Sequence, residues 1–343
     1  MTDHSISRRE FVQASAGAAL GAGALSAVSA PDATKTRSYN PEMEYRRLGR
    51  TNLMVSAISL GGHWKRIPYK TGTPEFKQNR REVIYACLDA GINYVDACSA
   101  GEVVAYAEAL GPRRKDIYFG FDWTLGRDPA IAGSLEKMKQ GLDDGLRQTG
   151  LDYVDLWRVT LREQTTRNTV HEIETVMAAL EWGKKTGKAR FTGVSTHHRP
   201  WIAEAVARYP QLEVIVTPYS AGSKEKPVGS MFDAFRKYDV GFIGIKPFAS
   251  GTLFASGGAP DSATKADDDE RARLALRYVL SSDVLHASIP GLITVDQVKN
   301  AVAAIKERRQ FDMAEAARHQ QLVAEMWRNL PPGYHWLRDW EWV

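Results

Sequence analysis

Cysteine is scarce in this chain: its 343 residues include only Cys87 and Cys98. The two lie neither at the spacing of a paired metal-ligand motif nor at that of a redox-active pair. A fold held together by several disulfides, as in small secreted domains, is therefore excluded. We predict that both cysteines are small buried side chains.

A large excess of either charge is also missing. The 45 lysines and arginines are nearly balanced by 41 aspartates and glutamates, for a net charge of +4, and the two signs are interspersed along the chain. Because a phosphate-binding face normally needs a local basic excess, we expect no nucleic acid partner. Hydrophobic residues make up 43% of the chain, enough for a full core in one large α/β barrel or in two ordinary domains.

No apolar run is long enough for a stable membrane span. The most uniform uncharged stretch, residues 14–30, is rich in alanine and glycine and only mildly hydrophobic. It follows Ser7-Arg8-Arg9-Glu10-Phe11 and ends in Val28-Ser29-Ala30, a small-residue pattern that suits signal peptidase. This arrangement resembles a twin-arginine export signal. We therefore predict a signal peptide over residues 1–30, a linker over 31–42, export by the twin-arginine machinery and a periplasmic location.

After residue 43, short β-rich runs alternate with longer amphipathic helical segments. A βα unit repeated eight times predicts a parallel sheet closed into a (β/α)8 TIM barrel, with a doubly wound open sheet as the alternative. The predicted strands cover 57–60, 94–97, 117–123, 153–159, 189–195, 214–219, 241–248 and 285–289.

Two further pieces flank the predicted barrel, which we assign to residues 43–343. Residues 44–49 and 52–56 predict a hairpin that closes the barrel floor. A C-terminal helix at about residues 312–329 leads into the aromatic tail "PPGYHWLRDWEWV". Because catalysis in such barrels takes place where the strands end, residues at the carboxyl ends of the strands are the candidates for chemistry.

Six segments resemble the aldo-keto reductase superfamily in both order and spacing. The resemblance covers residues 43–330 and implies a (β/α)8 barrel that reduces carbonyls with NAD(P)H. It also implies four catalytic residue types: a tyrosine that donates the proton, a lysine and an aspartate that lower the pKa of this tyrosine, and a histidine. The segments are "YRRLGRTNLMVSAISLGG", "GINYVDA", "LDYVDLW", "TGVST", "IKPFASGTLF" and "IPGLITVDQV".

Only one of those four catalytic positions is kept. Asp96 matches the aspartate, whereas the resemblance aligns Gly101 with the tyrosine, Asp122 with the lysine and Thr160 with the histidine. Hydride addition builds negative charge on the carbonyl oxygen, which a proton donor or a cation must meet. The four residues as they stand do not supply the family's usual proton donor.

The replacing residues form a pattern of their own. Arg158 lies two residues before Thr160 and should share its inward face. Asp96 and Asp122 would repel each other at the barrel mouth unless a cation or a shared proton compensates. We predict that Arg158 and Lys246 compensate, and we take Asp96, Asp122, Arg158 and Lys246 as the candidate catalytic residues.

Two other functions fit the same residues. An aspartate pair with different pKa values could act as acid and base in a non-redox lyase or isomerase that works on a sugar or hydroxy compound. The group could also be a structural ion-pair cluster in a ligand-binding pseudoenzyme. The first prediction remains an oxidoreductase that acts on a small carbonyl, polyol or sugar.

The resemblance also implies a dinucleotide site. It gives Tyr219 the nicotinamide-stacking position, Ser195 and Thr196 part of the carboxamide contact, and the loop "KPFASGTL" the pyrophosphate. The glycine of that loop permits close backbone approach, and its lysine adds positive charge. The candidate cofactor-binding residues are Ser195, Thr196, Tyr219, Phe248, Gly251 and Leu253.

The choice of cofactor stays open between NAD and NADP. The segment Gly291-Leu292-Ile293-Thr294 lacks the basic residue that would hold a 2′-phosphate, and Asn300 and Ala301 replace the family's glutamate and asparagine. An exported protein has no cytosolic NAD(P)H pool, so the cofactor is either carried out tightly bound or not used.

Histidines and aromatic residues occur at several strand ends. His63-Trp64-Lys65-Arg66 and His197-His198-Arg199 lack a paired ligand motif, so we predict hydrogen bonding and no metal site there. Trp64, Trp123 and Tyr219 either stack on a ligand or pack at the rim.

Overall fold

The computed structural model describes residues 31–62, 67–123, 126–162 and 167–339. The predicted signal peptide and the His63 motif with Trp64 lie outside these residues. Within them, no helix combines the length and the apolar character needed to cross a bilayer.

A two-stranded hairpin opens the fold. Strands β1 (Tyr45–Arg47) and β2 (Met54–Ser56) pair antiparallel, and the turn between them is a short 3-10 helix, η3 (Gly49–Thr51). Gly49 has a φ of +47°, and a Cβ built on it would lie 2.3 Å from the backbone nitrogen of Gly241. The hairpin therefore packs directly on the barrel backbone and forms the predicted floor.

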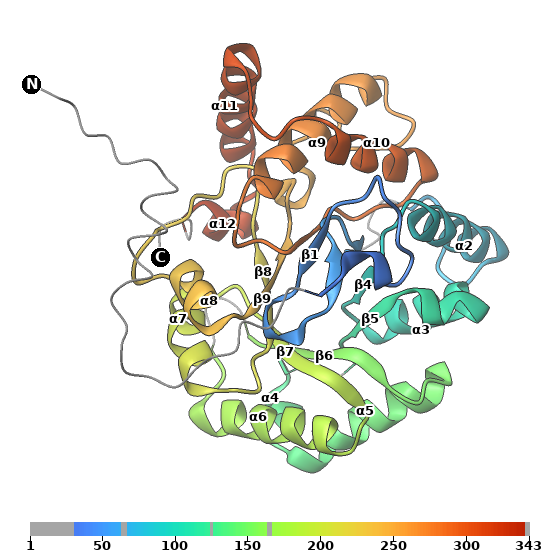
Figure 1. The fold of residues 1–343 in the computed structure, drawn as a ribbon, viewed down its shortest axis with the longest axis vertical. Helices are drawn as coiled ribbons and strands as arrows, with labels where there is room; N and C mark the ends of the chain where they lie inside the picture. The colour runs from blue at the N-terminus through green and yellow to red at the C-terminus, as the bar shows by residue number, and fades with distance from the viewer. Residues whose placement is uncertain (1–30, 63–66, 124–125, 163–166, 340–343) are drawn as a thin grey trace, which may run out of the picture. The chain divides into compact units, whose positions relative to one another are not determined.

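Eight parallel strands follow in chain order around the barrel, as Figure 1 shows. The ring is closed by a parallel bridge between Ile58 and Ser288, with the backbone nitrogen of Ser59 donating to the carbonyl of Ser288 at 2.9 Å. The predicted barrel is therefore confirmed. Its strands are β3 (Leu60–Gly61), β4 (Tyr94–Ala97), β5 (Tyr118–Phe121), β6 (Val154–Thr160), β7 (Ala189–Ser195), β8 (Val214–Pro218), β9 (Gly241–Ile245) and β10 (Ala287–Ile289).

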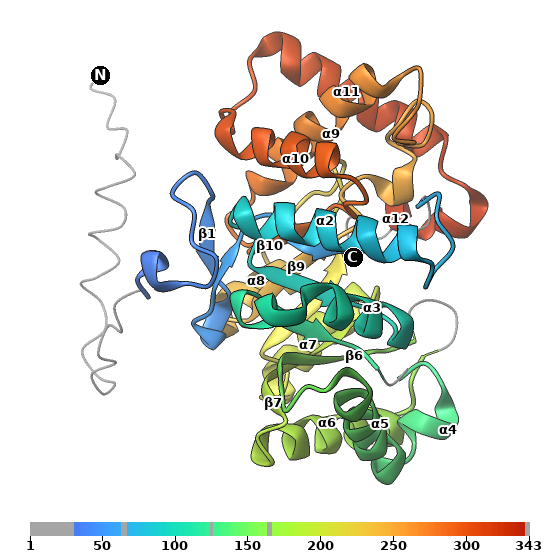
Figure 2. The same cartoon turned by 90° about the vertical axis from the view of Figure 1, so that its right-hand side faces the viewer.

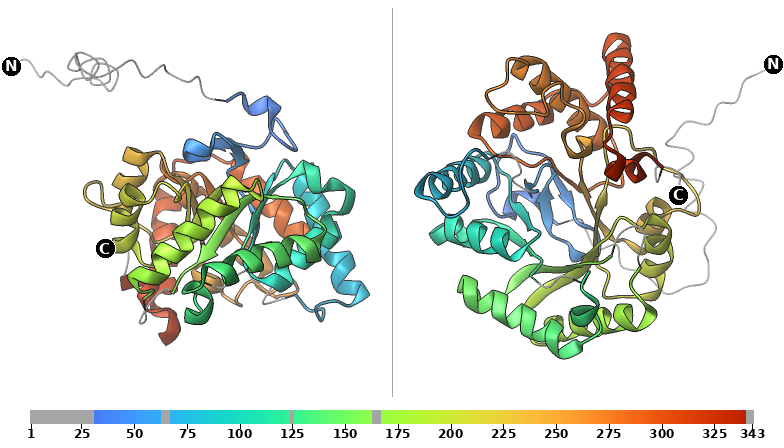
Figure 3. Two further views of the ribbon diagram at one scale, coloured as in Figure 1. Left: turned by 90° about the horizontal axis from the view of Figure 1, so that it is seen from below. Right: turned by 180° about the vertical axis from the view of Figure 1, so that it is seen from behind.

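Helices cover the outside of the barrel (Figures 1 and 3). Several begin with a side chain that accepts a backbone hydrogen bond, such as Thr169, which forms a capping box with Glu172. The helices are α2 (Pro74–Asp89), α3 (Ala100–Leu110), α4 (Pro129–Ala132), α5 (Leu135–Thr149), α6 (Val170–Lys185), α7 (Arg199–Arg208), α8 (Met231–Tyr238), α9 (Lys265–Leu280) and α10 (Val295–Lys306).

Two helices extend the chain beyond the barrel. The predicted C-terminal helix is α11 (Met313–Arg328), which begins with a capping box between Asp312 and Glu315. The short α12 (Trp336–Asp339) lies on the side of the barrel opposite β1, as Figure 2 shows. The floor hairpin and α12 are thus on opposite sides of the barrel.

The alternation of side chains along each strand separates two apolar layers. Inward residues such as Tyr94, Leu156 and Val216 form one buried cluster with Leu48 and Val55 of the floor hairpin. Outward residues pack against the helices in a second, larger cluster. Because Leu156 points inward, Arg158 and Thr160 on the same strand do as well.

Residues 31–42, the predicted linker, contact the barrel floor. The Thr36 hydroxyl donates to the Met54 carbonyl at 2.6 Å, and the Ser38 hydroxyl donates to the Asp116 carbonyl at 2.9 Å. Arg37 donates to the Ile117 carbonyl at 2.6 Å and to the carboxylate of Asp155 at 3.0 Å. Side chains of this segment, together with the carboxylate of Asp155 in the barrel, thus hold residues 36–38 on the floor.

Candidate active site

A cavity of about 900 Å³ opens at the carboxyl ends of the barrel strands. Residues at the ends of β4, β6 and β7 line one part of it, and the loop after β9 lines another. The cavity continues between α9 and α10, and the C-terminal tail closes one side with Tyr334 and Trp336. This is the end of the barrel at which such folds carry chemistry.

Arg158 and Asp96 form a buried bidentate ion pair at the base of this cavity. Arg158 Nε donates to Asp96 Oδ1 and Arg158 Nη2 donates to Asp96 Oδ2, both at 2.7 Å. The two side chains are only 2% and 4% exposed, and both residues line the cavity. Two parallel charge-assisted hydrogen bonds fix the plane of the guanidinium as well as its position.

Asp122 and Thr160 hold the other side of the same guanidinium. Arg158 Nη1 lies 3.2 Å from Asp122 Oδ2 and donates to Thr160 Oγ1 at 2.8 Å. The Thr160 hydroxyl in turn donates to Asp122 Oδ2. Among the described residues, the second carboxylate oxygen of Asp122 has no hydrogen-bond partner. Burial raises the pKa of Asp122 to about 6, although Arg158 and Thr160 act in the opposite direction.

The predicted meeting of Asp96, Asp122 and Arg158 is therefore present in the structure. Arg158 is the cation in contact with both carboxylates. The register of the strands explains why these three residues meet. Asp96 lies beside Gly120, and Gly120 lies beside Leu156. The residues two positions further on, Asp122 and Arg158, therefore face the same point as Asp96.

Lys246 lies elsewhere on the cavity wall. It follows β9 with a φ of +60°, and its Nζ is 3.5 Å from Nε2 of His197, which follows β7. We predicted that Lys246 compensates the charge of the two aspartates, but its ammonium lies beside this histidine. The signal in the sequence for this contact was a histidine two residues after the end of a barrel strand.

His197, for which we predicted only hydrogen bonding, is a buried residue of the cavity. It is 4% exposed, and its ring stacks on that of Trp336 with a centroid distance of 4.4 Å. Burial holds the pKa of His197 well below its usual value, and Lys246, Arg127 and Arg199 lower it further. The imidazole is therefore neutral at physiological pH.

The predicted cofactor residues divide into two sets. Ser195, Phe248 and Gly251 line the cavity. Thr196 and Leu253 are described but do not line it: Thr196 donates its backbone N–H to the Val216 carbonyl at 3.1 Å, and Leu253 packs in the cluster beneath α11.

Tyr219 does not reach the cavity wall either, among the residues described. Its ring is 4% exposed and meets Phe232 and Phe242 edge-on at 6.0 and 5.7 Å. Its hydroxyl donates to Glu225 at 3.0 Å. Strand β8 ends at Pro218, one residue before Tyr219, and Val214 and Val216 are the residues that point inward, so Tyr219 lies on the outward side.

The loop after β9 has a run of residues with positive φ. Lys246, Ala249 and Ser250 have positive φ values of 60°, 45° and 60°, and Gly251 has 92°. Non-glycine residues in this region are strained and persist where ligands are held. The backbone N–H of Ala249 donates to the Lys246 carbonyl at 2.9 Å and that of Gly251 to the Phe248 carbonyl at 2.8 Å, so these N–H groups hold the turn itself.

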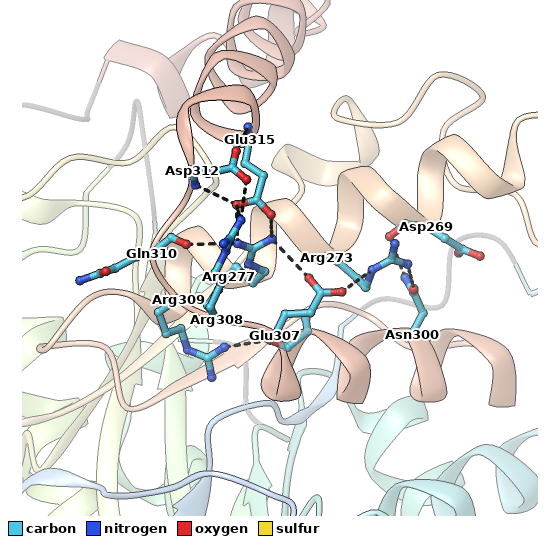
Figure 4. Close-up of polar contacts among 11 residues, drawn as sticks. Asp269, Arg273, Arg277, Asn300, Glu307, Arg308, Arg309, Gln310, Asp312 and Glu315 are labelled. Carbon is cyan, nitrogen blue, oxygen red and sulfur yellow. Dashed lines mark hydrogen bonds and ion pairs between the residues drawn. The ribbon is translucent and has the colours of Figure 1, made fainter.

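Asp269 of α9 and Asn300 of α10 line the far end of the cavity, and Figure 4 shows their polar contacts with Arg273. Asn300 donates to the Asp269 carbonyl at 3.0 Å and accepts from Arg273 at 2.7 Å. Arg273 is also paired with Glu307 at 2.8 Å, which ties the two helices together. Among the described residues at this end, Lys265 is the basic side chain that lines the cavity.

Other residues singled out in the sequence have structural surroundings. Trp123 stacks on Phe121 at 6.1 Å, away from the cavity wall. Cys98 lines the cavity, and its thiol donates to Glu102 at 2.9 Å; burial and Glu102 raise its pKa strongly. Gly101 is exposed in the first turn of α3. The described residues contain no cluster of three His, Cys, Asp or Glu able to hold a metal ion.

Known proteins resemble this chain in sequence and in fold. A rice protein named as a probable voltage-gated potassium channel subunit beta is 28% identical over 236 residues, which cover 64% of this chain and 69% of that protein. The L-galactose dehydrogenase of Arabidopsis thaliana is 24% identical over 330 residues, 86% of this chain and 99% of the relative.

A solved structure resembles this chain in fold, and a family model matches its sequence. The crystal structure of an aldo/keto reductase from Klebsiella pneumoniae in complex with NADP and acetate has a TM-score of 0.62 and 18% identity, and the match covers 84% of this chain and 96% of that one. The model of the aldo/keto reductase family matches residues 57–324. Since that match spans well over half of the chain, the protein belongs to the aldo/keto reductase family.

Proposed function

We propose that the protein is an NAD(P)-dependent oxidoreductase that interconverts a small carbonyl compound and its alcohol, with a polyol or a sugar as the alcohol. The observation that carries this proposal is the buried guanidinium of Arg158, held by Asp96 and Asp122 at the base of the cavity. The family assignment supports redox chemistry over the lyase and isomerase alternative. The named activity of the L-galactose dehydrogenase supports a sugar-like substrate.

Arg158 still has a hydrogen-bond donor for a ligand. A guanidinium carries five N–H groups. The contacts with Asp96, Asp122 and Thr160 use the Nε hydrogen, both Nη1 hydrogens and one Nη2 hydrogen. The remaining Nη2 hydrogen can be donated to a substrate oxygen. A preorganised cation at this point stabilises the charge that develops on that oxygen.

The cavity also fits a dinucleotide. Its volume of about 900 Å³ and its extension from the barrel mouth to the gap between α9 and α10 suit an elongated ligand. Ser195 and Phe248 would hold the end near Arg158, the turn ending in Gly251 would hold the phosphates, and Lys265 with Asn300 would hold the far end. When bound, the nicotinamide supplies or accepts the hydride.

The altered catalytic positions belong to the same proposal. Arg158 reaches Asp96 from β6 and provides there the positive charge that the family's lysine provides in its relatives. Asp122 and Thr160, at the positions aligned with the lysine and the histidine, both hydrogen-bond to Arg158. The family's four catalytic positions are thus replaced by a cluster of side chains centred on the guanidinium of Arg158.

Binding and turnover test this function directly. Purified protein titrated with NADH and with NADPH should show quenching of tryptophan fluorescence, and absorbance at the nicotinamide band should change with a panel of aldehydes, sugars and polyols. Arg158→Met should lower turnover by about 100-fold or more, the range for loss of one charge-stabilising donor. Absence of binding by both dinucleotides, in protein shown to be free of bound nucleotide by mass spectrometry, would contradict the proposal.

The proposed location is the periplasm. The residues that support it are Arg8 and Arg9, followed by the apolar stretch 14–30. Replacing both arginines with lysine should keep the protein in the cytoplasm, as shown by cell fractionation and by the retained mass of the uncleaved chain. An unchanged distribution between the fractions would argue against this export route.

A further inference from the structure

The position aligned with the family's tyrosine cannot provide a proton. Gly101 is exposed, and a Cβ built on it would have no heavy atom within 4 Å. Carbonyl reduction still requires a proton on the product oxygen. If the proposed function holds, another residue of the cavity must donate it.

The other protic groups near Arg158 are already engaged. The Thr160 hydroxyl donates to Asp122, and the Cys98 thiol donates to Glu102. Burial raises the pKa of that thiol strongly, and the ion pair with Asp96 raises the pKa of Arg158. The thiol and the guanidinium therefore hold their protons more tightly than usual, and the described residues that line the cavity do not include Asp122.

Lys246 is placed differently. It lines the same cavity as Arg158, at the carboxyl end of β9. Its backbone is held at a φ of +60°, a conformation that is costly for a residue with a side chain. Its Nζ lies 3.5 Å from Nε2 of His197. The residue with this strained backbone is thus also the one whose ammonium contacts the buried ring of His197.

The surroundings of His197 explain the value of that contact. The ring is buried, stacks on Trp336, and stays neutral. A neutral imidazole can accept a hydrogen bond from an ammonium without adding charge. The contact with His197 places the ammonium of Lys246 at the wall of the cavity, while Arg158 stays bound to its two carboxylates.

We infer that Lys246 is the catalytic acid that protonates the substrate oxygen, with His197 as its positioning residue. The carbonyl carbon accepts a hydride from the reduced nicotinamide, and the C=O π electron pair moves to the oxygen. The N–H bond of Lys246 breaks as the new O–H bond forms, and the neutral amine regains its proton from water. The carbonyl is reduced and the nicotinamide oxidised. This inference rests on the proposed function.

Lys246→Gly is the suitable test variant, because glycine adopts the positive φ of this position without strain. We expect kcat for aldehyde reduction to fall by about 100-fold or more, the range for loss of a general acid. Affinity for NADH and NADPH, measured by tryptophan fluorescence, should stay within a few-fold of the wild type. Added methylamine should restore part of kcat, because the glycine leaves room for an external amine. Lys237→Ala, an exposed lysine on α8, is the matched control.

Three results would overturn the inference. A kcat for Lys246→Gly close to that of the wild type would remove Lys246 from the chemistry. Weaker dinucleotide binding with unchanged kcat would assign the lysine to the cofactor phosphates. Loss of kcat without amine rescue, repeated in Lys246→Met with intact dinucleotide binding, would assign it a structural role. Wild-type protein that binds no dinucleotide would instead contradict the proposed function itself.

Discussion

Arg158 donates two parallel hydrogen bonds of 2.7 Å to the carboxylate of Asp96 in the interior of the barrel. Removing one partner of a buried ion pair leaves an uncompensated charge, which costs about 3–5 kcal/mol. Arg158→Met should therefore lower the free energy of unfolding by that amount in urea titrations. Arg208→Met is the control, because Arg208 is 64% exposed in its pair with Glu174 and should change stability by less than about 1 kcal/mol. A smaller loss for the Arg158 variant would show that the cluster rearranges.

The stability of the protein should depend on pH because the carboxyl group of Asp122 is buried. Burial raises its pKa from 3.8 to about 6 in the folded state. Between these two values the folded state holds the proton that the unfolded chain has lost, so the free energy of unfolding falls as pH rises through this window and stays lower above it. Asp122→Asn should remove this fall. The free energy of unfolding of the variant minus that of the wild type should therefore be larger at pH about 7 than at pH about 4, by more than about 1 kcal/mol. Parallel stability curves for both proteins would contradict the assignment.

Cys98 should be unreactive although it lines the cavity. Its thiol donates to Glu102, and burial raises its pKa, so the thiolate that attacks alkylating reagents is nearly absent. Cys87 is fully buried, and burial raises its pKa to about 12. We expect no labelling by iodoacetamide at neutral pH in the folded protein, and labelling of both thiols in urea, by mass spectrometry. Replacing Glu102 with Gln should speed the labelling of Cys98.

Two glycines predict opposite effects on stability. Gly101 lies in the first turn of α3 with open space around a built Cβ, so Gly101→Ala should stabilise the fold by about 0.5–1 kcal/mol. A Cβ on Gly120 would lie 2.2 Å from the Tyr94 hydroxyl, so Gly120→Ala should destabilise it by about 1–3 kcal/mol. Thermal unfolding of both variants measures the difference. A loss of turnover in Gly101→Ala would show that this position takes part in catalysis.

Much of the fold was predictable because its signals are local. Each barrel strand is a short apolar run bounded by turn residues, and the observed strands fall within the predicted ranges or extend beyond them by one residue. The meeting of Arg158 with Asp96 and Asp122 followed from the two-residue period of the strands.

The rest of the site depends on conformations that side-chain patterns do not encode. Tyr219 is an exception, because the alternation that turns Val214 and Val216 inward already places residue 219 on the outward face. Lys246 faces His197 because of a positive φ, which is rare for lysine. The stacking of Trp336 on His197 joins residues far apart in the chain, and no local spacing predicts such a contact.

The docking of Thr36, Arg37 and Ser38 beneath the barrel has a practical consequence. A surface or carrier protein attached ahead of residue 31 would be joined to the pole facing away from the cavity entrance. Immobilisation through that end should leave the mouth open to small molecules, whereas anchoring through the aromatic tail would crowd the wall that Trp336 builds.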